Sequence, residues 1–77
     1  MFPSIKARKM FAVLARAPLG YTTLRQVGSH KVLRSSSGYP DLFLAFHDKA
    51  TVAPGLVRKI LVDDVGLTEE EALSLLK

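Results

Sequence analysis

YTTLRQVGSHKVLR, residues 21–34, decides the fold, because it predicts two antiparallel strands joined by a two-residue turn. Residues 21–27 and 30–34 are rich in residues that favour an extended chain, and apolar and polar side chains alternate along the second run. Gly28 and Ser29 suit a type II′ turn, since glycine reaches the positive φ of its first position without strain. The rest of the chain is placed around this hairpin.

The turn also sets the register of the hairpin, in which Leu24 is expected to face Leu33. Successive side chains of a strand point to opposite faces of a sheet. One face should therefore carry these two leucines, with Gln26 and Lys31 towards the turn, and rest on helices. The other face should stay accessible and positive, and its expected members are Thr23, Arg25, Val27, His30, Val32 and Arg34.

A third strand is predicted at residues 42–47, which are apolar on both sides. The core face of this strand should be formed by Leu42, Leu44 and Phe46. The face assigned to His30 should receive Phe43, Ala45 and His47.

Helices are predicted before and after the strands in the sequence. Apolar residues at three- and four-residue spacing indicate an amphipathic helix over residues 4–17, with Ser4 as N-cap and Pro18 and Gly20 ending it. A second helix is predicted over residues 54–63, with a proline in its first turn and core residues Leu56, Val57, Ile60 and Leu61.

A glycine at position 66 stops the second helix, and a short third helix follows. Thr68 and Glu71 form a capping box at its start. The order helix, three antiparallel strands, helix and short terminal helix predicts one α+β domain over residues 1–77, with the helices on one face of the sheet.

The composition excludes several classes of protein. With 48% apolar residues and a net charge of +4 in 77 residues, the chain is expected to be a soluble globular domain rather than disordered or membrane-spanning. The absence of cysteine excludes disulfides, thiolate metal sites and a cysteine nucleophile, and it suits a reducing cytoplasm. No export signal is recognised, since Arg16 and Pro18 interrupt the first apolar run.

Charge is distributed unevenly. Residues 1–40 carry seven basic and no acidic side chains, whereas residues 41–77 carry all seven acids against four bases. An excess of positive charge in one half indicates an anionic partner, most often nucleic acid, or simply a well-solvated surface.

Several motifs together resemble the HicA toxins, a family of small bacterial mRNA interferases. The motifs are Gly28-Ser29-His30 at the hairpin, a third strand ending in His47, and PGLVRKIL at residues 54–61 followed by GLT at 66–68. The resemblance covers roughly residues 5–76. It implies a fold like that of double-stranded-RNA-binding domains, a HicB-type antitoxin as protein partner, no metal or cofactor, and His30 as the catalytic residue.

The chain also departs from the family pattern. Lys31 stands where many members have a second histidine, the turn between the second and third strands is rich in serine, and the third strand lacks its usual proline. These departures affect the match at His47 more than the match at His30.

The chemistry suits the residues independently of the family. Metal-free RNA cleavage needs a group that removes the proton of a ribose 2′-hydroxyl, and imidazole, with an unperturbed pKa of about 6.5, can do so at neutral pH. His30 is the predicted general base or acid. The predicted RNA or phosphate contacts are Arg25, Ser29, Lys31, Arg34 and His47.

Two other functions stay open at this point. The chain could be a non-catalytic RNA-binding module of the same fold, or a degenerate family member that docks a protein on its apolar third strand. Phe43 has three possible roles: stacking on a base, contact with an antitoxin, or packing, which is the usual role of an aromatic side chain on a half-covered sheet.

Overall fold

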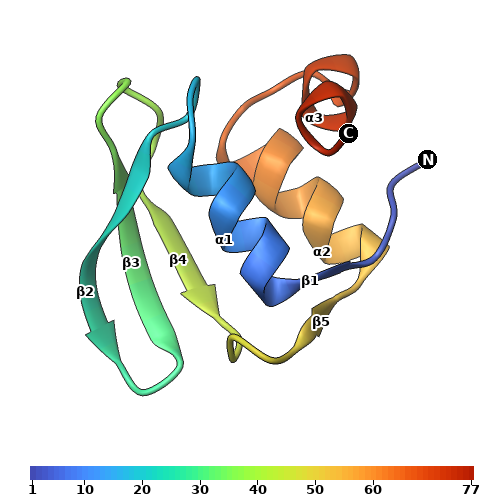
Figure 1. Cartoon of the computed structure of the whole chain (residues 1–77). Coiled ribbons are helices and arrows are strands. Elements are labelled where there is room, and N and C mark those ends of the chain that lie inside the picture. Colours follow the sequence, from blue (N-terminus) through green and yellow to red (C-terminus); the bar gives the residue numbers. More distant parts are fainter.

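The chain folds around the predicted hairpin into an α+β arrangement in which three helices accompany a small antiparallel sheet (Figure 1). The computed structural model describes every residue from Met1 to Lys77. The elements in order are β1 Ile5–Lys6, α1 Ala7–Ala15, β2 Tyr21–Val27, β3 His30–Ser35, β4 Leu42–Ala45, β5 Thr51–Val52, α2 Pro54–Arg58, the π-helical turn η1 Lys59–Asp64, and α3 Glu69–Leu75.

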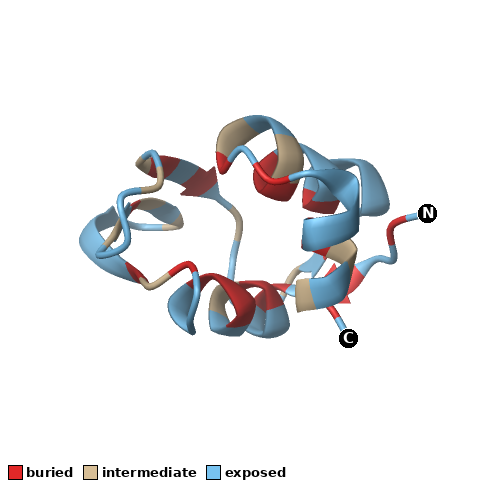
Figure 2. Ribbon diagram, turned by 90° about the horizontal axis from the view of Figure 1, so that it is seen from above, coloured by how far each residue is buried: buried red, intermediate tan, exposed pale blue.

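Strands β2, β3 and β4 form the three-stranded sheet in that order, and all three helices lie on the same side of it (Figure 1). Buried and exposed residues alternate along β4 and the helices bury one side, whereas β2 is exposed from Thr22 to Val27 (Figure 2). The core is one cluster of 19 buried residues, all apolar except for the hydroxyl of Tyr21. No helix of the molecule is long and apolar enough to cross a membrane.

The turn of the hairpin is confirmed. Gly28 has a φ of 60° and no residue other than glycine has a positive φ, as a type II′ turn requires. Near the turn the register is also as predicted, since Val27 pairs with His30 and Arg25 with Val32.

Further from the turn the predicted register is wrong, because a bulge lies between Thr23 and Arg25. Thr23, not Leu24, pairs with Leu33, and Leu24 is 55% exposed. One extra residue in a strand reverses the faces of everything beyond it. Thr23 therefore moves to the helix-facing side of the sheet, where it lines a hollow between α1 and β2.

The bulge brings Tyr21 into the core. In the predicted register Tyr21 would have pointed to the open face, whereas in the structure it is buried and its hydroxyl donates a hydrogen bond of 2.6 Å to the carbonyl oxygen of Pro40. A buried tyrosine combines a large apolar area with a satisfied polar end. Burial of Tyr21 replaces the expected burial of Leu24.

Burial raises the pKa of Tyr21 to about 12, and the negative charge of Asp41 adds to this effect. An unfolded tyrosine ionises near pH ~10. The free energy of unfolding should therefore hold its full value below pH ~10 and fall as the pH rises towards the folded pKa. We expect Tyr21→Phe to lose less stability than the wild type between pH ~9 and ~11.5. Urea unfolding at both pH values measures this, and an equal loss in the two proteins would contradict it.

The third strand is shorter than predicted. Leu42 and Leu44 are buried as expected, and Phe46 is half-buried with its ring stacked on that of Phe11 at 5.2 Å between centroids. The strand ends at Ala45, and His47 lines a hollow with Gln26 and Ser29 rather than the hollow of His30, so the prediction that His47 lies on the face of His30 is wrong. A hydrogen bond of 3.0 Å from the amide of Ala50 to the carbonyl oxygen of His47 closes a turn there instead.

The first helix begins at Ala7, and Ser4 is not its N-cap. Residues 5 and 6 instead pair with Val52 and Thr51 in a small second sheet that the sequence did not reveal. The amide of Ala7 donates to the carbonyl oxygen of Ala50 at 2.9 Å, so a distant segment satisfies the helix start that Ser4 was expected to cap.

The C-terminal helices follow the prediction closely. Pro54 is the first residue of α2, and η1 continues the same helical rod to Asp64. Gly66 has a φ of 97°, which ends the rod, and both hydrogen bonds of the capping box between Thr68 and Glu71 are present. Leu56 is the exception, because it is exposed although its spacing predicted burial.

Candidate nucleic-acid interface on the open face of the sheet

The face of the sheet that points away from the helices is uncovered (Figure 1). The strand registers place on this open face Arg25 and Val27 of β2, His30, Val32 and Arg34 of β3, and Phe43 and Ala45 of β4. All of these residues are exposed except Val32, which is half-buried. The open face is thus made of basic and apolar side chains around one histidine.

His30 is the first residue of the central strand, directly after the turn. It lies between Val27 on one neighbouring strand and Ala45 on the other, and it is exposed. A hollow of about 290 Å³ beside it is lined by Arg25, Val27, Val32 and Phe43, among others. The imidazole is therefore accessible to a ligand lying on the open face.

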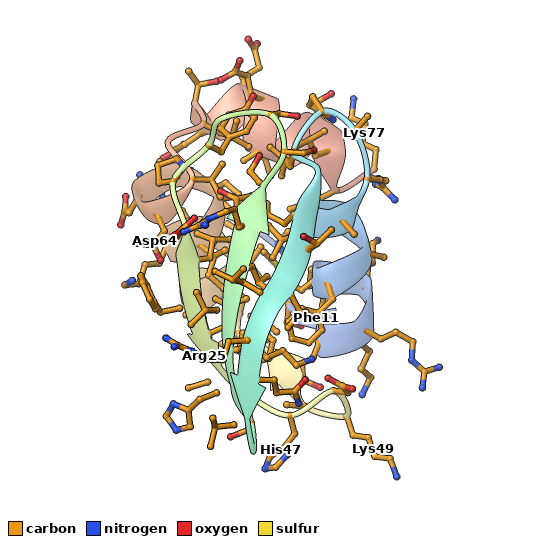
Figure 3. The ribbon with its side chains drawn as sticks, turned by 90° about the vertical axis from the view of Figure 1, so that its left-hand side faces the viewer. Phe11, Arg25, His47, Lys49, Asp64 and Lys77 are labelled. Atoms are coloured by element: carbon orange, nitrogen blue, oxygen red, sulfur yellow. The ribbon has the colours of Figure 1, made fainter.

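The two arginines of the open face differ in their partners. Arg34 makes two hydrogen bonds to the carboxylate of Asp41, at 3.2 and 2.9 Å, and this contact lowers the pKa of Asp41 below its usual range. Arg25 takes part in none of the ion pairs of the molecule. In Figure 3, which views the open face, Arg25 lies over the sheet. Arg25 is therefore the cation that is free to meet an anion beside His30.

Lys31 lies on the opposite side of the sheet from His30. Its ammonium group sits 3.9 Å from the centroid of the Phe11 ring and 2.8 Å from a carboxylate oxygen of Asp48, and its side chain is only 11% exposed. The hydrogen bond from Lys31 lowers the pKa of Asp48. Lys31 is among the residues that line the hollow beside His30, but its ammonium group is held at Asp48 and Phe11 and does not reach the predicted phosphate site. Its contacts instead hold the segment after β4 against α1.

Ser29 and His47 lie together at a second hollow, near the tip of the hairpin. This hollow of about 560 Å³ is also lined by Gln26, Lys49 and Asp48. His47 and Lys49 project beyond the end of the sheet (Figure 3). The predicted contacts therefore divide between two places: Arg25 and Arg34 share the open face with His30, whereas Ser29 and His47 share the tip.

Two residues of these sites were missed or misjudged from the sequence. Lys49 was not singled out, since it lies in a loop that reaches the hairpin tip only in the folded chain. Phe43 was expected to pack, yet it is 76% exposed. The alternation of β4 already placed Phe43 on the open face, and this was the available signal.

No group of three or more histidine, aspartate or glutamate side chains is placed to hold a metal ion.

The fold and the site together describe the class of protein: it is a small α+β protein in which one face of the sheet is uncovered and carries basic side chains and a histidine. A scan against protein-family models finds no matching family, and searches of curated proteins and of solved structures find no match.

Proposed function

We propose that this protein is an endoribonuclease of the toxin type, with a fold like that of double-stranded-RNA-binding domains, which cleaves mRNA in the cytoplasm without a metal ion. The observation that carries the proposal is the pairing of an accessible His30 with an unpaired Arg25 on an uncovered face. One side chain supplies proton transfer and the other supplies positive charge at the same hollow.

The reaction is an in-line attack within the RNA. His30 accepts the proton of a ribose 2′-hydroxyl, and the 2′-oxygen forms a bond to the adjacent phosphorus. The bond from phosphorus to the 5′-oxygen of the next nucleotide breaks, and that oxygen leaves with a proton from the imidazolium or from water. The products are a 2′,3′-cyclic phosphate and a 5′-hydroxyl.

Arg25 is the group assigned to the charge that develops on the phosphorane oxygens. A well-placed proton donor or acceptor contributes on the order of 10²–10⁴ in rate, and one donor to a developing oxyanion on the order of 10²–10³. With one group of each kind, a slow nuclease is expected. Such an enzyme suits a toxin that is held inactive by a tightly bound partner.

The partner is a HicB-type antitoxin that covers the open face. Val27 and Phe43 are 72% and 76% exposed, and large apolar side chains exposed together on one face are typical of a surface that a partner buries. An antitoxin bound there would cover His30 in the same contact.

The proposal predicts that the purified wild-type protein degrades single-stranded RNA in the presence of EDTA. The 3′ ends of the products should carry cyclic phosphate, which phosphatase alone does not remove and which acid opening makes removable. Induction of the gene without its partner should arrest growth. Intact RNA after long incubation, together with normal growth, would contradict the proposal.

A non-catalytic RNA-binding module is the second candidate. It is favoured by the ion pairs of Lys31 with Asp48 and of Arg34 with Asp41. These pairs occupy two of the predicted phosphate-binding cations and leave Arg25 as the unpaired cation beside His30. In that case the wild type and His30→Ala would bind RNA equally and neither would cleave it. Absence of RNA binding would leave a protein-docking role for the open face.

A further inference from the structure

Phe43 lies on the open face with nothing packed over it. Its neighbours in the sheet are fixed, since it pairs with Val32 of the central strand, while Ala45 pairs with His30. The stacked ring pair of the molecule is Phe11 with Phe46, on the other side of the sheet, and Phe43 has no such partner. Its exposed fraction of 76% is larger than that of Val27 or Leu24. An aromatic ring displayed in this way is free to stack on a ligand.

The ring also lies close to the reacting group. Because His30 pairs with Ala45 and Val32 pairs with Phe43, His30 and Phe43 are diagonal neighbours across two strands. Such neighbours are separated by roughly 7–8 Å, within reach of aromatic side chains. Both side chains line the same 290 Å³ hollow, and Arg25 lines it as well.

We propose that this hollow binds an unpaired RNA base stacked on Phe43, with the adjoining phosphate at Arg25 and the ribose at His30. The inference rests on the proposed ribonuclease function and names its substrate class, which is single-stranded RNA. A base in a duplex has both of its faces covered by neighbouring bases, so it cannot lie flat on Phe43.

The charges of the open face favour a nucleic acid over a neutral apolar partner. A neutral partner that covered Phe43 would also bury Arg25, and an unpaired buried cation is costly. A nucleotide supplies a flat aromatic base and an anion side by side, which match the ring of Phe43 and the guanidinium of Arg25. The carboxylate of Asp41, which directly precedes β4 in the chain, is already paired with Arg34.

Binding can be measured without cleavage. The probe is a short single-stranded oligoribonucleotide that carries 2′-O-methyl groups, so that no 2′-hydroxyl can attack, and one 2-aminopurine, whose fluorescence falls when it stacks. We expect the wild type to quench the probe and Phe43→Ala to bind it about 5- to 150-fold more weakly, the range that loss of one base–aromatic stack produces. Phe43→Tyr should restore binding, whereas Phe43→Leu, which keeps apolar area without an aromatic ring, should not.

Leu24→Ala is the matched control, because Leu24 is an exposed apolar residue of β2 in the same sheet that does not line this hollow. It should bind the probe within about twofold of the wild type. Both residues are exposed, so their substitution should leave the thermal unfolding midpoint unchanged.

Three results with the probe would overturn the inference. They are full binding by Phe43→Leu, an equal loss in Leu24→Ala, or a duplex probe bound as tightly and with the same dependence on Phe43. Loss of antitoxin binding in Phe43→Ala with unchanged RNA binding would also overturn it and would assign the ring to the protein partner. Quenching that depends on Phe43, in a wild type that cleaves no RNA, would support the base site and reject the proposed catalysis.

Discussion

His30→Ala is expected to lower the rate of RNA cleavage in EDTA by roughly 10²–10⁴, the usual contribution of one positioned acid or base. RNA binding should change little, because His30 is exposed and the cation assigned to the phosphate is Arg25. The measurement is single-turnover cleavage of a labelled oligoribonucleotide with enzyme in excess, alongside direct binding to the 2′-O-methyl version of the same oligonucleotide.

His47→Ala is the matched control for this experiment. It removes the same side chain from the same end of the sheet, but His47 lies at the tip hollow with Ser29 and not on the open face. We expect it to weaken RNA binding without a large change in the rate of the bound complex. If the rate falls by the same factor in both variants, the assignment of the general base to His30 alone is wrong.

Leu33→Ala is expected to lower the free energy of unfolding by about 2–5 kcal/mol, the cost of truncating a buried leucine. Leu33 is 3% exposed and lies on the helix-facing side of the central strand. A small domain has only about 5–15 kcal/mol of stability in total, so this loss is a large fraction of it and should lower the urea unfolding midpoint. Urea unfolding followed by circular dichroism measures the loss.

Leu24→Ala provides the comparison that tests the bulge. In the unbulged register Leu24 and Leu33 would pair in the core and their substitutions would cost similar amounts. In the structure Leu24 is 55% exposed, so its substitution should cost about 0.5 kcal/mol or less. Similar losses in the two variants would show that the predicted register was correct and the bulge absent.

Most of the architecture could be predicted from local sequence. The hairpin depends on Gly28, whose positive φ is a local requirement, and the capping box depends on two side chains three residues apart. Helical periodicity located α2 and its continuation as far as Gly66. Each of these features involves groups within a few residues of one another, so the sequence pattern contains the whole interaction.

Two of the features that were predicted wrongly depend on distant contacts. Ser4 does not cap the first helix, because residues 5 and 6 pair with a strand more than 40 positions later in the chain. Leu24 lies outside the core because the bulge in β2 turns Tyr21 inward in its place. The hydroxyl of the buried Tyr21 is hydrogen-bonded to the carbonyl oxygen of Pro40. No pattern within either segment records the partner that decides its conformation.

The candidate site divides in the same way. Alternation from the turn correctly placed Arg25, His30 and Arg34 on one face, since they lie on the hairpin strands whose side chains alternate about that turn. The sequence could not reveal that Arg34 is paired with Asp41 or that Lys31 is held by Phe11 and Asp48. These contacts determine which cations remain available to an anion.

By itself, then, the sequence determined the order of the three helices and of β2, β3 and β4, the turn between β2 and β3, and the face on which His30 emerges. Only the tertiary structure decided which basic side chains are unpaired and where His47 lies. The physical reason is the separation along the chain of the groups that interact. Backbone conformation and side-chain alternation follow from neighbours along the chain, whereas burial and ion pairing are settled between segments that meet only when the chain has folded.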